Sequence, residues 1–180
     1  MDYLHQHWLT SQTFVGAAHF ISASLGLLLG LGVLFLQPGS KLHKTAGYVF
    51  VPVLLLVNLS AVFIHQMGFR WGPFHMLIPF SLWALYQGMR PFYQKKQLDY
   101  PTKMRYHVRG MVSGALGLWA AFTAEFTVRT PAIGHFLGML PFDKFWVLTI
   151  QGLSIALFFR YLIRIMSNYQ LRRLFSTQLA

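Results

Sequence analysis

Four histidines are spaced so that each of the first four apolar stretches of the chain carries one. They are His19, His43, His75 and His107. If successive helices alternate in direction, His19 and His75 lie toward one membrane surface, and His43 and His107 toward the other. In a four-helix bundle, helices one and three can face each other across the core, as can helices two and four. The pattern therefore predicts two opposed histidine pairs, and opposed imidazoles are ligands that hold haem b.

A second interpretation uses only residues expected near the outer surface. His19, His65, His75 and Glu125 fall there, and three imidazoles with one carboxylate would suit Zn or Cu. A carboxylate within an apolar helix is costly without a partner, which makes Glu125 a candidate functional residue. Arg129 offers a simpler explanation, because it follows one helical turn later and could form a salt bridge with Glu125.

Small residues lie on the same helix faces as these histidines and would leave space for a flat macrocycle. They are Gly26, Gly30, Gly47, Gly110, Gly114 and Gly117. Small residues four apart also bring transmembrane helices into close contact, and close packing is the preferred interpretation for the glycines alone. The histidines have a plain alternative as well, since an imidazole is tolerated at the membrane boundary.

Several other chemistries are excluded. The chain has no cysteine, so thiolate metal ligands, disulfides and cysteine nucleophiles cannot occur. It also lacks HExxH, GxSxG, a phosphate-binding loop and paired carboxylates, which leaves nothing for general acid–base catalysis. Neither a hydrolase nor a transferase is expected, and enzymatic activity is left open only as an electron-transfer component of an oxidoreductase.

The composition indicates a membrane environment. Hydrophobic residues make up 55% of the chain and charged residues only 11%, whereas a typical soluble domain has about 25% charged residues. The mean hydropathy is +0.47. The formal net charge of +11 comes from basic residues between apolar runs, which indicates membrane topology and no nucleic-acid partner. An integral membrane protein in contact with the lipid bilayer is expected.

Five stretches approach the ~20 residues that a spanning helix needs. They are residues 14–36, 41–64, 73–90, 101–128 and 145–165. Ser40 is a suitable N-cap for the second helix and Pro73 a suitable first-turn residue for the third. We expect one all-α domain over residues 1–180, a polytopic helical bundle with the basic C-terminal segment continuing along the interface. Twelve Lys and Arg residues fall on one side and three on the other, which predicts an external N-terminus and a cytoplasmic C-terminus.

Two short runs carry a family resemblance. The run from His43 to Phe50 reads HKTAGYVF, and the run from His107 to Met111 reads HVRGM. The first resembles the HxxxGxxY/F opening of a helix in an uncharacterised bacterial family of small predicted membrane proteins, a domain of unknown function. The second is similar to the His-Arg-Met stretch of that family.

The resemblance covers roughly residues 41–129. The sequence departs from the family pattern at Val108, where an Arg often follows the histidine. The resemblance implies a multi-helix membrane fold and highlights His43 and His107, but it implies no activity. We expect the protein to lie in the bacterial inner membrane. The histidine layout also resembles, by pattern alone, the two-haem transmembrane cytochrome b families, which carry electrons between opposed histidine pairs.

From these observations we expect a b-type haem protein that carries electrons across or within the membrane. His43 and His107 would ligate an inner haem, and His19 and His75 an outer one. A quinol or a partner subunit would supply the electron, and the small size suits a subunit of a larger complex. Two alternatives remain at this stage: a non-catalytic structural or assembly subunit of a respiratory membrane complex, and an outer-face Zn- or Cu-binding protein.

Overall fold

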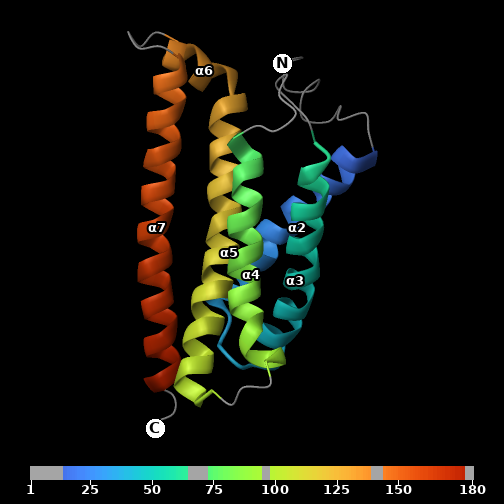
Figure 1. Ribbon diagram of the computed structural model, residues 1–180, viewed down its shortest axis with the longest axis vertical. Helices are drawn as coiled ribbons and strands as arrows, with labels where there is room; N and C mark the ends of the chain where they lie inside the picture. Colours follow the sequence, from blue (N-terminus) through green and yellow to red (C-terminus); the bar gives the residue numbers. More distant parts are fainter. Residues whose placement is uncertain (1–13, 65–72, 95–97, 139–143, 177–180) are drawn as a thin grey trace.

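A computed structural model describes residues 14–64, 73–94, 98–138 and 144–176 of the chain. Within these ranges all regular structure is helical (Figure 1). The elements are α2 (Phe14–Phe35), α3 (Lys41–Val62), the 3₁₀ helix η1 (Pro73–Met76), α4 (Leu77–Tyr93), α5 (Tyr100–Arg129), α6 (Pro131–Gly138) and α7 (Lys144–Ser176). The predicted all-α fold class is therefore confirmed.

The five long helices that the structure describes, α2, α3, α4, α5 and α7, alternate in direction along the bundle, and α2 crosses obliquely behind the others in the view of Figure 1. Each of α2, α3, α4 and α5 packs chiefly against two of the other three: α2 against α3 and α5, and α4 against α3 and α5. This order places α2 diagonally opposite α4, and α3 diagonally opposite α5, as the sequence predicted. The remaining long helix, α7, packs against α5 at the edge of the bundle, and the short α6 connects these two helices.

Among the residues that the structure describes, three helical segments are long and apolar enough to cross a membrane: α2, α3 and residues 149–176 of α7. Large apolar side chains such as Leu28, Leu59 and Leu157 are exposed on their outer faces. Such faces are suited to contact with lipid. In lipid, the hydrogen bonds within each helix satisfy the polar groups of the backbone. The chain is thus a helical membrane bundle. We also expect α4 and α5 to cross the membrane, which would give five spans; this stays a prediction.

The end of the bundle that is lowest in Figure 1 is called the inner end below. Two helices, α3 and α5, begin there, and capping side chains fix where each begins. Ser40 Oγ accepts a hydrogen bond of 3.1 Å from the amide of His43, so the predicted N-cap is confirmed. Asp99 accepts one of 3.1 Å from the amide of Thr102, and α5 consequently begins at Tyr100. These caps satisfy amides that have no partner within the helix.

The last helix differs most from the sequence prediction. Instead of ending near residue 165 and continuing along the interface, α7 is a single helix to Ser176. The physical reason is a buried polar stripe: Ser167 and Gln170 are 4% and 6% exposed, and the Gln170 amide donates to Leu34 O at the end of α2. This contact binds the C-terminal turns of α7 to the bundle.

Residues of α3 and α5 make up most of the hydrophobic core, which also includes residues of α2, α4 and α7. Phe50 and Leu54 of α3 are 0% and 1% exposed, and they pack with Ala115 and Val112 of α5 in one cluster. Nearby, α4 and α5 touch at Gly88 and Gly110, where a Cβ on Gly110 would collide with the Gly88 backbone and with Ala84 O. Small residues allow such close approach of membrane helices, and this contact also positions the candidate site.

Candidate cofactor site

A cavity of about 540 Å³ lies at the inner end of the bundle, and both His43 and His107 line it. We call it the inner cavity. Its walls come from the end of α2, the starts of α3 and α5, the end of α4 and the last turns of α7. Its volume is in the range of about 300–1,000 Å³ typical of small-molecule and cofactor sites. The two predicted inner ligands are therefore brought together, from helices on opposite sides of the core.

His107 is held in a defined orientation by α4. Its Nδ1 atom lies 3.0 Å from Gly88 O. Because a carbonyl oxygen can only accept, Nδ1 carries the proton and donates it, and Nε2 is left with a free lone pair. The Phe92 ring packs edge-on to the imidazole, with 5.0 Å between the ring centroids. A histidine whose other nitrogen donates to a backbone carbonyl is the usual arrangement of a metal-ligating imidazole.

His43 contributes an unsatisfied polar atom. Its Nδ1 is buried and has no hydrogen-bond partner among the described residues. Leaving a polar atom buried without a partner costs about 1–3 kcal/mol, and such atoms in native structures call for an explanation. A ligand in the inner cavity would supply one.

Gly47 keeps the inner cavity open beside His43. It follows His43 by one helical turn and lines the same cavity, and a Cβ built on it would meet no atom within 4 Å. Met89, Met104 and Lys44 also line the cavity, and the Lys44 side chain is exposed. The site therefore combines two imidazoles, apolar walls, free space and one cation, a set that fits a haem with its carboxylates.

The two predicted outer ligands have different surroundings. His19 Nδ1 lies 2.9 Å from Ser60 Oγ of α3, and His19 lines a second cavity of about 800 Å³, called the lateral groove below. His75 lies in η1 and lines neither this groove nor the inner cavity. An outer haem between His19 and His75 stays a prediction.

One residue of the proposed outer metal site, Glu125, has another role in the structure. Glu125 Oε1 and Arg129 Nη2 form an ion pair of 2.7 Å, which is the simpler role that the sequence offered for Glu125. Within the described residues, His, Asp and Glu form no group of three or more that could hold a metal ion. His65 lies outside those residues, so a site that includes it stays a prediction.

The glycines divide into two groups. A Cβ at Gly26, Gly30, Gly110 or Gly114 would come close to atoms of a neighbouring helix. Close packing, the interpretation preferred for the glycines from the sequence, therefore explains these four. Gly47 and Gly117 differ, because open space surrounds the position of each added Cβ. The first opens the inner cavity and the second the lateral groove.

Sequence reasoning missed the contribution of α7 to the inner cavity. Gln170 and Leu174 line it, although the sequence predicted that this basic segment continues along the membrane interface beyond the last span. A signal was present: Ser167, Gln170 and Leu174 recur at intervals of three and four residues, which places them on one face of a continuous helix. The charged Arg172 and Arg173 between them obscured this pattern.

The fold and the cavity define the class of protein: a helical membrane bundle with a histidine-lined cavity near one end. The chain belongs to the family of predicted membrane proteins DUF2306, whose model matches residues 16–163. The match spans both His43 and His107 and confirms the resemblance to an uncharacterised membrane-protein family. No curated protein and no solved structure matches the chain.

Proposed function

We propose that the chain binds b-type haem between His43 and His107 and carries electrons within the membrane. One observation carries the proposal: imidazoles from two diagonally opposed helices line a single cavity. His107 can offer Nε2 to a ligand, because its Nδ1 is committed to Gly88 O, and His43 has a buried Nδ1 without a hydrogen-bond partner among the described residues. Bis-histidine ligation is a common way to hold haem iron.

When bound, the haem would supply reversible one-electron chemistry. The protein residues have separate tasks. The hydrogen bond to Gly88 O fixes the His107 ring and makes its other nitrogen a better donor. Val33, Leu34 and Val112 supply buried apolar wall, which excludes water and influences the redox potential. Lys44 offers a positive charge for a carboxylate at the edge of the cavity.

The wider role follows from size and topology. A five-span bundle with an external N-terminus and a cytoplasmic C-terminus would place the inner cavity near the cytoplasmic face. We infer that the protein is a subunit of a larger complex in the bacterial inner membrane, and that a quinol or a partner subunit exchanges electrons with the site. An outer haem on His19 and His75 would extend the electron path across the bilayer.

Filling the cavity tests the proposal without touching the histidines. Gly47→Leu places a side chain in open space, so the fold should tolerate it while the macrocycle is excluded. Gly152→Leu is the matched control, because Gly152 also has open space around an added Cβ but does not line the inner cavity. We expect purified Gly47→Leu to lose at least tenfold in haem content and Gly152→Leu to match wild type. Equal haem in all three proteins would overturn the assignment.

Substitution of single histidines tests which of them act as haem ligands. His43→Ala and His107→Ala should each abolish the bis-histidine absorption bands, whereas His135→Ala, an exposed residue of α6, should leave them unchanged. If His19→Ala and His75→Ala remove half of the haem, the outer site is also occupied. Bands that survive both inner substitutions would contradict the inner site.

A further inference from the structure

The lateral groove carries its positive charge at one end. Arg105 and Arg109 line it, lie one turn apart near the start of α5 and are both exposed. Neither arginine forms an ion pair with a carboxylate within the part of the chain that the structure describes. Side chains at i and i+4 face the same way, and guanidinium groups donate in a fork that matches phosphate oxygens. This end of the groove is therefore suited to a phosphate.

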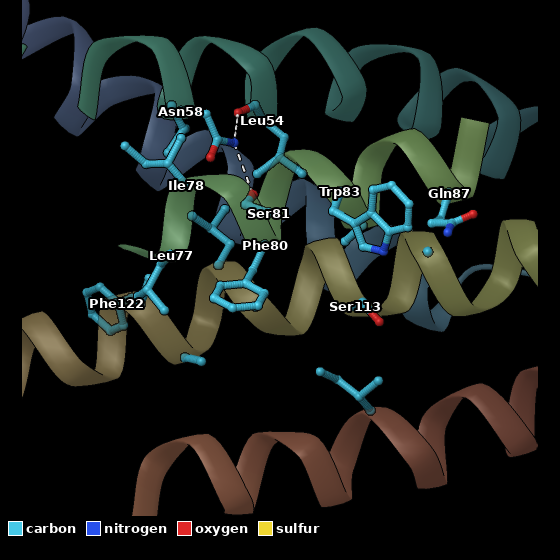
Figure 2. Close-up of a pocket in the computed structure, with 18 of the residues that line it drawn as sticks. Leu54, Asn58, Leu77, Ile78, Phe80, Ser81, Trp83, Gln87, Ser113 and Phe122 are labelled. Carbon is cyan, nitrogen blue, oxygen red and sulfur yellow. Dashed lines mark hydrogen bonds between the residues drawn. The ribbon is translucent and has the colours of Figure 1, made fainter. Parts of the chain in front are cut away.

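Further along the groove the same face of α5 is small and apolar. Gly117 lines it, and a Cβ there would meet no atom within 4 Å. Phe80 of α4 and Phe122 of α5 line the groove beyond this point, and Figure 2 shows Phe80 directed from α4 toward α5. At 1.5 Å per residue, Gly117 lies ~12 Å and Phe122 ~20 Å beyond Arg109. These lengths bracket the ~15 Å depth of one leaflet.

A buried acceptor lies on the α4 wall. Gln87 lines the groove (Figure 2), and its Oε1 atom is buried without a hydrogen-bond partner among the described residues. Gln87 precedes Gly88, which contacts Gly110 of α5, so it lies at the level of Arg109. A hydroxyl on a bound headgroup would satisfy this oxygen.

We propose that the lateral groove binds one anionic phospholipid, with its phosphate on Arg105 and Arg109 and an acyl chain lying over Gly117. A zwitterionic headgroup brings its own cation, which the two arginines repel, and a neutral quinone leaves both arginines without a counter-charge. Basic pockets between transmembrane helices on the cytoplasmic side bind anionic headgroups, and the Lys and Arg count predicts that this end is cytoplasmic. The site is separate from the inner cavity and does not depend on haem.

Native mass spectrometry of the full chain in detergent tests the headgroup. The protein is equilibrated with equal amounts of phosphatidylglycerol and phosphatidylcholine that carry the same acyl chains. With ~1 kcal/mol for each of two arginines, one phosphatidylglycerol should be retained with a preference of about 30-fold. The double variant Arg105→Gln/Arg109→Gln should lose most of this preference.

The control removes the same charge from the same end of the bundle. Lys103 and Arg172 lie outside the groove lining, so Lys103→Gln/Arg172→Gln should keep the preference if the site is specific. Equal losses in the two double variants would show only diffuse attraction and would overturn the proposal. Retention of a neutral quinone in place of the phospholipid would also overturn it.

A second pair of variants tests the acyl chain. Gly117→Leu fills the open part of the groove and should reduce retention of phosphatidylglycerol at least tenfold, while Gly152→Leu should not. Circular dichroism melting of each variant shows whether the fold is intact. Because a Cβ at Gly117 meets no atom within 4 Å, we expect Gly117→Leu to fold, and a folded variant that retains phosphatidylglycerol as well as wild type would refute the proposed position of the acyl chain.

Discussion

Three glycines on one helix allow the packing of the bundle to be tested in a graded way. At Gly110, an added Cβ would lie 2.6 Å from Ala84 O and 2.5 Å from the Gly88 Cα, and backbone atoms cannot move aside alone. At Gly114, the nearest atom is the end of a flexible leucine side chain at 3.2 Å, and at Gly117 no atom lies within 4 Å. Alanine at the three positions should therefore have three different effects.

Gly110→Ala requires α4 and α5 to separate by roughly 1 Å to restore ordinary contact distances. That shift would stretch the 3.0 Å bond between His107 Nδ1 and Gly88 O beyond hydrogen-bonding range. Overpacking costs ~1–3 kcal/mol and the lost bond ~1 kcal/mol, against a gain of ~1 kcal/mol in helix propensity. We expect a net loss of about 1–3 kcal/mol in the free energy of unfolding.

The other two variants serve as internal controls. Gly114→Ala should be close to neutral, because the leucine end can rotate, and Gly117→Ala should be stabilised by up to ~1 kcal/mol through helix propensity. Titration with a denaturing detergent in mixed micelles, followed by circular dichroism, measures all three. Equal stability of Gly110→Ala and Gly117→Ala would refute the backbone contact between α4 and α5.

Further predictions concern polar groups. Hydrogen bonds from the first turn of α5 hold the pKa of the Asp99 cap below its ordinary value, so Asp99→Ala should lower the melting temperature at pH 7. The difference in melting temperature between wild type and Asp99→Ala should disappear as the pH falls below that pKa. The melting temperature of Asp99→Asn should lack this pH dependence. Asn58 Nδ2 donates to Ser81 Oγ at 3.0 Å, and a double-mutant cycle to alanine should give about 0.6 kcal/mol of coupling, typical of membrane helices, while zero coupling would contradict the bond. Glu125 is 38% exposed beside Arg129, so Glu125→Gln should change stability by less than ~1 kcal/mol; loss of stoichiometric zinc from this variant would instead support the outer metal site.

The sequence predicts how deep a residue lies in the membrane better than it predicts which way the residue faces. Apolar length and caps such as Ser40 locate the helices along the chain, and alternation then brings His43 and His107 to the same end. The direction in which a side chain points around its helix depends on the neighbours. His19 is hydrogen-bonded to Ser60 and lines the lateral groove, whereas His75 lies in a 3₁₀ turn and does not line that groove; similar depth in the sequence does not predict this difference in surroundings.

The roles of identical residues also depend on tertiary contacts. Gly47 and Gly110 each follow a histidine by about one turn, yet one faces open space and the other touches a backbone. No local pattern distinguishes them, because the difference arises from where α4 crosses α5. The C-terminal part of α7 is similar: its arginines favour a segment along the membrane interface, while Gln170 is buried and donates to Leu34 O.

The most direct test of the central claim is the absorption spectrum of the purified protein, oxidised and then reduced with dithionite, with haem iron measured in the same sample. The protein should be produced in cells with ample haem. We predict a sharp α-band on reduction and at least one haem iron per chain, with the bands lost in His107→Ala. A featureless spectrum from folded wild-type protein would contradict haem binding in the inner cavity.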